Sequence, residues 1–109
     1  MKSLIQKFIK ATNAFDVEAA IALFAHDAVI DDVSVGDTFV NTAGVRKYLE
    51  NFFVGYHTVT KLVSVEVIDD QRAKAHVDFT GDFGHETGGL DVTVNSDGLI
   101  VAVGAYLDE

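Results

Sequence analysis

The segment Ala22-Leu23-Phe24-Ala25-His26-Asp27-Ala28-Val29-Ile30-Asp31-Asp32 joins the end of an amphipathic helix to an apolar strand that finishes on two adjacent carboxylates. Alternate residues of a strand share a face, so Ile30 and Asp32 lie on one face and Asp31 lies on the other. If the Ile30 face is buried, Asp32 is carried into an apolar interior, where a carboxylate is either costly or useful. Asp32 is therefore our candidate general acid or base, and Asp31 is expected to be solvated.

Helical periodicity precedes and follows this segment. A first helix is predicted to begin at Ser3, whose spacing to a glutamine fits a capping box. Asp16 is the expected N-cap of a second helix, and Asn41 or Thr42 that of a third, which ends at Gly55. The third helix is predicted to turn inward its apolar and aromatic residues Val45, Tyr48, Leu49, Phe52 and Phe53.

After Tyr56 the hydrophobic period changes to two, which indicates strands. Turn signals at Asp69-Asp70-Gln71, in the glycine-rich stretch 81–89 and at Asn95-Ser96-Asp97-Gly98 divide the stretch into four strands in a meander. Helices segregated to one face of a curved antiparallel sheet define an α+β fold. We expect residues 1–109 to form one such domain.

Composition narrows the possible functions. A chain of 109 residues with 49% hydrophobic residues has enough apolar material for one core. It contains no cysteine, which excludes disulfides and thiolate chemistry. The formal net charge of −9 argues against nucleic-acid binding. Without a signal peptide or a membrane-length apolar run, we expect a cytoplasmic protein that does not contact the membrane.

The last predicted strand is apolar on both faces. Leu99, Val101 and Val103 are assigned to the buried face, which leaves Ile100, Ala102 and Tyr106 on the outer one. An apolar band of this kind is unfavourable in water. We therefore predict a homodimer formed through the outer face of the sheet by these three residues.

Four segments together resemble the nuclear transport factor two-like superfamily, which includes ketosteroid isomerases and SnoaL-type polyketide cyclases. They are Asn13-Ala14-Phe15-Asp16, the segment from Ala22 to Asp32, Gly44-Val45-Arg46-Lys47-Tyr48-Leu49 and Asp97-Gly98-Leu99-Ile100-Val101. The resemblance covers nearly the whole chain. It implies a cone-shaped, cystatin-like fold with three N-terminal helices packed on a curved antiparallel sheet, as a single SnoaL-like domain.

The resemblance to ketosteroid isomerases implies a general-base role for Asp32. Their oxyanion hole needs a tyrosine on the first helix and a protonated aspartate on a late strand. The matching positions here are Phe8 and Leu90, and the supporting tyrosine of the third helix is matched by Leu49. All three are apolar, so ordinary steroid isomerase activity is not expected.

The resemblance also implies a pocket inside the cone that takes a small apolar molecule. Tyr56 and His57 follow the third helix and are candidate hydrogen-bond donors to a ligand. No metal is expected, because His76 and Asp78 lack a third ligand at a recognisable spacing. No organic cofactor is expected either. The side chains expected to line the pocket are Phe8, Phe15, Phe24, Ile30, Phe52, Phe53, Val65 and Leu90.

Three functions remain open at this point. The first is an isomerase- or lyase-type enzyme in which Asp32 catalyses isomerisation, cyclisation or elimination by proton transfer. The second is a non-catalytic binder of an apolar ligand, and the third is a dimerisation module whose cone is filled by phenylalanine. For the first, desolvation is expected to raise the pKa of Asp32, so that Asp32→Asn stabilises the fold by ~1 kcal/mol.

Overall fold

The computed structural model describes residues 1–108, which form three α-helices, one π-helical turn and six strands. In chain order these are α1 (Lys2–Asn13), α2 (Val17–Ile21), β1 (Phe24–Asp32), β2 (Asp37–Val40), α3 (Asn41–Leu49), the π turn η1 (Glu50–Val54), β3 (Val59–Asp69), β4 (Arg72–Gly81), β5 (Gly84–Val94) and β6 (Ile100–Leu107). The strands form one sheet in the order β2-β1-β6-β5-β4-β3. The fold is therefore α+β, as the sequence predicts.

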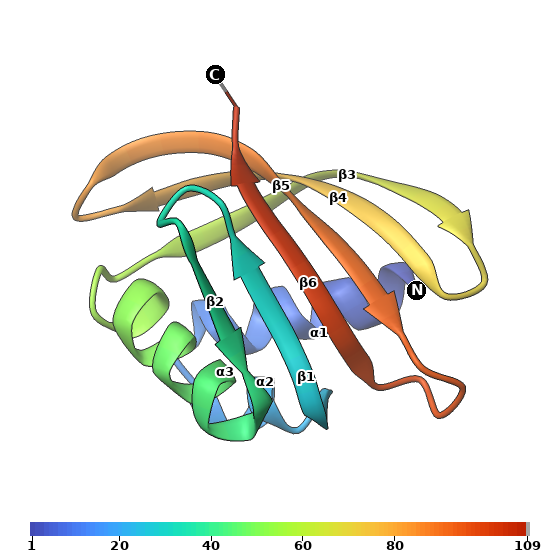
Figure 1. Ribbon diagram of the computed structural model, residues 1–109. Helices are drawn as coiled ribbons and strands as arrows, with labels where there is room; N and C mark the ends of the chain where they lie inside the picture. Colours follow the sequence, from blue (N-terminus) through green and yellow to red (C-terminus); the bar gives the residue numbers. More distant parts are fainter. Residues whose placement is uncertain (109) are drawn as a thin grey trace.

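The sheet is mixed rather than antiparallel, which corrects one prediction. Strands β3 to β6 form the expected antiparallel meander, but β6 pairs with β1 in parallel. The chain enters β3 at the far edge of the sheet, and the meander brings β6 back beside β1 in the same direction (Figure 1). The short strand β2, which the sequence analysis does not anticipate, pairs antiparallel with the end of β1.

The sheet curves strongly and its long strands β3, β4 and β5 bend over the helices, as Figure 1 shows. Helix α1 packs on β3, and α3 packs on β1 and β2. The core lies between these helices and the concave face of the sheet. Its largest fully buried side chains are Ile5, Ile30, Leu49, Ile100, Val45 and Val77.

Two of the predicted helix starts agree with the structure. Asp16 caps α2 by accepting a hydrogen bond from the amide of Ala19 at 3.0 Å. The side chain of Asn41 accepts hydrogen bonds from two amides in the first turn of α3, which satisfies donors left free at a helix start. The capping role of Ser3 is wrong, because α1 begins at Lys2 and has no side-chain cap.

Helix α3 continues without a break into the π turn η1. The amide of Gly55 donates to the carbonyl of Glu50 at 2.8 Å, five residues earlier rather than four. A π turn holds one extra residue compared with an α-helical turn. The predicted helix end at Gly55 is confirmed, but the extra residue changes which side chains after Leu49 face the sheet.

A bulge in β6 overturns part of the predicted dimer surface. Ile100 lies opposite Val94, whereas Ala102 lies opposite Thr93, so Val101 is the extra residue between them. The bulge turns Ile100 into the core, where it is 1% exposed. The prediction that Ile100 lies on the outer face is therefore wrong, because strict alternation does not hold through the bulge.

Tyr106 does lie on the outer face of the sheet. It pairs with Gly89 of β5, and a Cβ atom placed on Gly89 would come within 2.2 Å of the tyrosine hydroxyl. The amine of Lys74 lies 5.9 Å from the centre of the same ring. Because Gly89 has no side chain, the tyrosine ring can lie flat against the sheet at this position.

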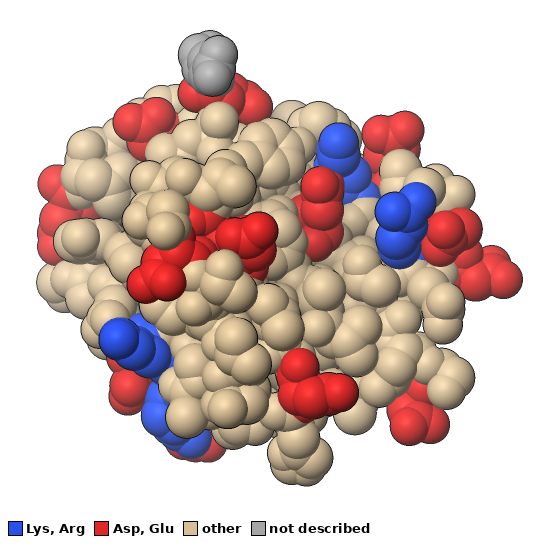
Figure 2. Space-filling view, viewed as in Figure 1, with Lys and Arg blue, Asp and Glu red and all other residues tan. Residues whose placement is uncertain are grey.

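Figure 2 shows many acidic and few basic side chains on the face in view.

The exposed edge of the sheet is covered at one point by α1. The side-chain amide of Asn13 donates to the carbonyl of Thr60 at 2.8 Å, and its oxygen accepts from the Thr60 amide at 2.7 Å. Asn13 thus binds both the amide and the carbonyl of Thr60, which a further strand would otherwise pair with.

Within residues 1–108, no helix is long and apolar enough to cross a membrane.

Candidate functional site

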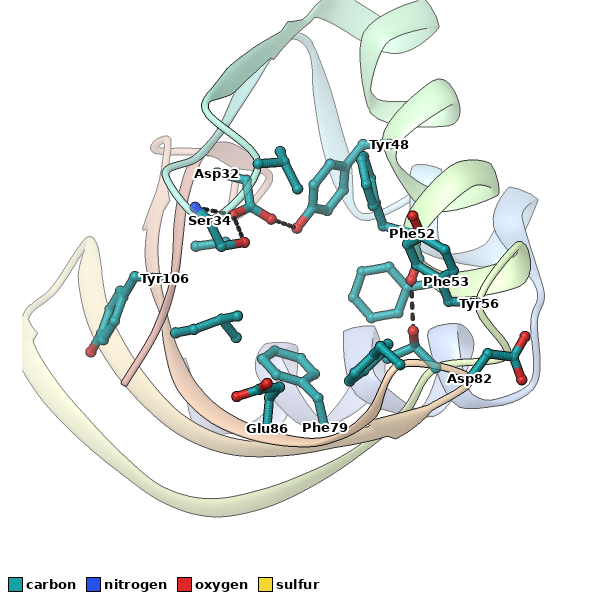
Figure 3. A pocket seen from close by; sticks show the side chains of 15 residues that line it. Asp32, Ser34, Tyr48, Phe52, Phe53, Tyr56, Phe79, Asp82, Glu86 and Tyr106 are labelled. Atoms are coloured by element: carbon teal, nitrogen blue, oxygen red, sulfur yellow. Dashed lines mark hydrogen bonds between the residues drawn. The ribbon is translucent and has the colours of Figure 1, made fainter. Parts of the chain in front are cut away.

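A pocket of about 460 Å³ lies between the concave face of the sheet and the segment formed by α3 and η1 (Figure 3). Most of its wall is apolar and aromatic, with a few polar side chains, which is the usual composition of a small-molecule site. It is lined by Asp32, Ser34, Val35, Tyr48, Phe52, Phe53, Tyr56, Thr58, Phe79, Asp82, Phe83, Glu86, Ala105, Leu107 and Tyr106, although the ring of Tyr106 points away from the pocket (Figure 3).

The buried acid of this pocket is Asp32, the last residue of β1. Its side chain is on the same strand face as Ile30 and only 6% of the residue is exposed. Oδ2 accepts a hydrogen bond of 2.5 Å from the hydroxyl of Tyr48, which comes from α3 (Figure 3). Asp31, on the opposite face, is exposed. The structure thus brings a carboxylate and a phenol together at the pocket wall.

The other oxygen of Asp32 is held by the turn that follows β1. Oδ1 accepts hydrogen bonds from the amide of Ser34 at 2.9 Å and from its hydroxyl at 2.6 Å. A short acidic side chain that binds the backbone two residues on is a typical turn-forming arrangement. Asp32 therefore receives three hydrogen bonds, and the expectation of an isolated, desolvated carboxylate is wrong.

Tyr48 is held in its protonated form. Burial raises the pKa of the Tyr48 hydroxyl well above its ordinary value, and the neighbouring charge of Asp32 and the hydrogen bond to it act in the same direction. A tyrosinate beside a carboxylate would place two negative charges in contact within a buried site. The phenol therefore stays a hydrogen-bond donor throughout the neutral range.

Aromatic rings form the wall that faces the sheet. Tyr48, Phe52 and Tyr56 follow one another along α3, η1 and the turn after η1, with ring centres 5.2 Å and 5.9 Å apart. Phe83, from the turn between β4 and β5, meets Tyr56 edge to face at 6.2 Å. This row of rings runs from the buried dyad of Asp32 and Tyr48 to the mouth of the pocket.

The mouth is closed on one side by contacts between two turns. The amide of Asp82 donates to the carbonyl of Tyr56 at 2.8 Å, and the carboxylate of Asp82 lies 2.9 Å from Nδ1 of His57. His57 itself is exposed and does not line the pocket. The proposal that His57 donates directly to a ligand is therefore wrong, because its ring is turned toward Asp82 and away from the interior.

Only Phe52 and Phe53 of the eight expected wall residues line the pocket. Phe8, Phe24, Ile30 and Leu90 are buried in the core instead, where Phe8 packs its ring against Phe24 and Phe53. These side chains fill the end of the fold under α1, and the cavity occupies the opposite end, beside η1 and the β4–β5 turn.

The other two expected wall residues also lie away from the pocket. Phe15 is 40% exposed and its ring contacts His57 edge to face. Val65, in the edge strand β3, is half-buried and packs against the core. Their assignment to the pocket wall is wrong because a hydrophobic pattern predicts burial on a face but does not locate the end of the fold at which a cavity remains.

Sequence analysis missed several residues of the site, of which Tyr48 and Ser34 matter most. Tyr48 was predicted to face inward, and it lies one position before Leu49, the residue matched to the supporting tyrosine. Leu49 is a fully buried core residue without a polar group. Ser34 follows Asp32 by two residues, and an aspartate often accepts a hydrogen bond from the amide two residues later. This spacing in the sequence is a signal that predicts the contact.

The fold and the site together define a class of protein. A curved sheet with helices on its concave face encloses an apolar pocket, and one buried carboxylate with a phenol partner faces that pocket, which is the arrangement of a small-molecule pocket protein. The chain belongs to the SnoaL-like domain family, within the nuclear transport factor two-like superfamily, because the model of that family matches residues 5–103.

Solved structures of this superfamily share the fold at low sequence identity. The enzyme SalBIII, described as epoxide hydrolase/cyclase-like and involved in pyran ring formation, is 18% identical with a TM-score of 0.86, and the match covers 98% of this chain and 89% of that one. A protein of unknown function with a cystatin-like fold from Methylobium petroleophilum is 18% identical with a TM-score of 0.85, over 99% of this chain and 75% of that one.

A third neighbour contains a bound molecule. RV0760c from Mycobacterium tuberculosis, in complex with estradiol-17β-hemisuccinate, is 19% identical with a TM-score of 0.85, and the match covers 96% of this chain and 91% of that one. At these identities the likeness establishes the fold alone. Ketosteroid isomerase-like and polyketide cyclase proteins are among the structural neighbours of the chain.

Proposed function

We propose that this protein binds a small apolar molecule in the cone-shaped pocket and catalyses proton transfer on it, with Asp32 as the general acid and base. The observation that carries the proposal is a carboxylate that is nine-tenths buried at the wall of an apolar cavity of about 460 Å³. A cavity of this size suits a ligand with several rings or a long alkyl chain. It also disfavours the alternative of a cone filled by phenylalanine.

The hydrogen bonds of Asp32 assign a role to each neighbour. Ser34 holds Oδ1 through two bonds, so that Oδ2 is the oxygen that meets a substrate. In the reaction Oδ2 takes a proton from an activated C–H or from an O–H of the substrate and returns it at a second position. No other co-reactant is needed for an isomerisation, and the same base serves a cyclisation or an elimination. Tyr48 is a positioning residue, because its hydroxyl fixes Oδ2.

Tyr56 is the proposed donor to the substrate. Its ring lines the pocket, and within residues 1–108 its hydroxyl has no hydrogen-bond partner, whereas the hydroxyls of Ser34 and Tyr48 are both bound to Asp32. A hydroxyl aimed at the oxygen where charge develops lowers the barrier to enolate formation. We therefore assign the base to Asp32 and the electrophilic donor to Tyr56, and we leave His57 outside the chemistry.

Two of the structural neighbours support a ligand in this place. RV0760c is crystallised in complex with estradiol-17β-hemisuccinate, and SalBIII is described as having a role in pyran ring formation, so a small-molecule ligand is in keeping with this fold. Steroid isomerisation itself remains unexpected here, because Phe8 and Leu90 are apolar core residues and supply no oxyanion donor.

We also propose a cytoplasmic location, since no helix in residues 1–108 is suited to span a membrane.

Binding is tested with the neutral fluorescent probe N-phenylnaphthylamine. Ala105 lines the pocket and Ala102, three residues earlier on β6, lies on the outer face, so the two positions form a matched pair. We expect Ala105→Leu to abolish probe binding and Ala102→Leu to leave it unchanged. Leu107→Trp at the mouth provides a second blocking variant if Ala105→Leu fails to fold. Equal binding by all variants would show that the probe binds elsewhere.

Catalysis is tested by isotope exchange on β-tetralone, an apolar ketone with acidic α protons. We expect the protein to accelerate loss of the α-proton NMR signal in deuterated water, and Asp32→Asn to lower that acceleration by about 10²–10⁴-fold. Asp31→Asn, at the exposed neighbouring position, is the matched control and should retain the full rate. Binding without any acceleration would favour the second function, a non-catalytic ligand carrier.

We further propose that two copies associate through the outer face of the sheet around Ala102 and Tyr106. The support is a half-buried patch at the centre of the sheet in which the small residues Ala102 and Gly104 allow close approach of a second sheet. Light scattering at micromolar concentration tests this proposal. Ala102→Arg should convert the dimer to a monomer, and a monomeric mass for the unmodified protein would contradict the proposal.

A further inference from the structure

The charged side chains that line the pocket are of one sign. They are Asp32, Asp82 and Glu86, and no lysine or arginine is among the lining residues that the structure describes. Charged walls around a cavity of low dielectric constant concentrate the field inside it. The negative potential inside the pocket therefore disfavours binding of an anionic ligand and favours binding of a cationic one.

The buried member of this set has no positive counterpart. Asp32 is nine-tenths buried and aimed at the cavity, yet its hydrogen-bond partners, Ser34 and Tyr48, are neutral. Within residues 1–108, no lysine, arginine or histidine forms an ion pair with it. Buried charges in proteins are normally compensated by an opposite charge. Asp32 therefore adds its negative charge to the field that a ligand meets throughout the pocket.

At the mouth, Glu86 and Asp82 differ in their surroundings. Asp82 already contacts His57, whereas Glu86 has no ion-pair partner within the described residues. Glu86 pairs with Phe79 across β4 and β5, so its side chain is on the concave face with that ring. Figure 3 shows its carboxylate at the pocket, on the same side of the view as Asp32. Glu86 is thus the uncompensated carboxylate at the entrance.

The hydrogen-bond donors and acceptors of the pocket also favour a cationic ligand. Carboxylates only accept hydrogen bonds, while an ammonium group only donates them, up to three at once. The hydroxyls of Ser34, Tyr48 and Thr58 already donate within the protein. The pocket therefore offers many acceptors and few free donors, and a ligand that fits it has to bring donors of its own.

Given the proposed ligand-binding function, we infer that the natural ligand is an apolar amine, with its protonated nitrogen near Glu86 and its apolar skeleton reaching toward Asp32. The aromatic row of Tyr48, Phe52 and Tyr56 then contacts the skeleton, and π faces close to the nitrogen add cation–π attraction. The negative charge of the pocket disfavours an apolar carboxylic acid of the same shape.

Three probes with one skeleton test this inference: naphthylmethylamine, naphthylmethanol and naphthoate. Titration calorimetry of the full chain at neutral pH and low salt should show the amine binding about tenfold more tightly than the alcohol, and naphthoate about tenfold more weakly, as expected for one ion pair or one repulsion at the pocket. The preference for the amine should shrink as salt is added, because the mouth is open to ions.

A matched pair of variants tests whether Glu86 is the carboxylate that binds the amine. Glu86→Gln should weaken binding of the amine about three- to tenfold without changing binding of the alcohol, whereas Glu66→Gln, on the exposed outer face of β3, should change neither. If the alcohol and naphthoate bind as tightly as the amine, the inference is wrong and the pocket function stands. If none of the three probes binds, the proposed pocket function itself is wrong. Equal effects of both variants would overturn the assignment to Glu86.

Discussion

The hydroxyl of Tyr48 donates a hydrogen bond of 2.5 Å to Oδ2 of Asp32, and this bond ties helix α3 to the end of strand β1. The two residues are 16 positions apart in the chain and both are buried. The contact joins the two walls of the pocket at its inner end. It therefore has a structural effect that can be measured separately from any chemistry.

Removal of this hydroxyl should destabilise the fold. In Tyr48→Phe the ring remains, but Oδ2 of the buried Asp32 loses its donor, which costs about 1–3 kcal/mol of unfolding free energy. Urea denaturation at neutral pH measures the loss. Tyr56→Phe is the matched control, because that tyrosine is 45% exposed and its hydroxyl is not bonded within the described residues, so its effect should stay below about 0.5 kcal/mol. Equal losses in the two variants would contradict the assigned role of the bond.

The same hydroxyl should make stability fall in alkaline solution. The folded state raises the pKa of Tyr48 above the value of about 10 found in an unfolded chain, so above that pH the unfolded chain gives up a proton that the folded protein retains. The contribution of Tyr48 is complete below about pH 10 and declines by about 1.4 kcal/mol per pH unit above it. The difference in unfolding free energy between the wild type and Tyr48→Phe, followed from neutral to alkaline pH, isolates this effect. A constant difference would show that the tyrosine ionises equally in both states.

Asp32→Asn should destabilise the protein, contrary to the expectation from sequence. Three donors are directed at the ionised carboxylate, and hydrogen bonds to charged groups are the stronger ones. The amide cannot accept equally at both positions, so we expect a loss of about 1–3 kcal/mol at neutral pH. Asp31→Asn, in the exposed position next to it, should change stability by less than about 0.5 kcal/mol. A stabilised Asp32→Asn would restore the view of Asp32 as a strained, desolvated acid.

Gly89→Ala should displace the ring of Tyr106 from the outer face. The new Cβ would come within 2.2 Å of the tyrosine hydroxyl, so the ring has to swing away and lose its contact with the sheet, at about 1–2 kcal/mol. Tyr106→Ala loses the same contact. The double variant should therefore cost clearly less than the two single effects added together, as expected for residues in contact. Additive losses from denaturation curves would mean that the two positions act independently.

The sequence predicted the fold class and the burial of Asp32 because both depend on local patterns. Alternation along the segment ending at Asp32 assigns Ile30 and Asp32 to one face, and the structure finds both buried. The side-chain caps of Asp16 and Asn41 depend only on residues within one turn. Features of this kind can be read without knowledge of distant contacts.

The errors concern contacts between distant segments and departures from regular geometry. A helical pattern shows that Tyr48 faces inward, but it does not show which position of α3 comes opposite the end of β1. The bulge at Val101 shifts the register by one residue and buries Ile100, and nothing in an apolar alternating strand marks it. Six of the eight expected wall residues fill the core or the surface, because the location of a cavity depends on how all the elements pack together.

The π turn η1 makes the shape of the pocket depend on the number of residues in its wall as well as on their identity. One residue added to or removed from a helix rotates everything beyond it by about 100° around the axis. One residue more or fewer in Glu50–Val54 would therefore turn Tyr56 to a different direction relative to Tyr48 and Phe52, with which it now forms one row. A single codon inserted or deleted at this turn would thus give a pocket of different shape with the same lining side chains, a route to a new ligand that leaves the buried dyad of Asp32 and Tyr48 untouched.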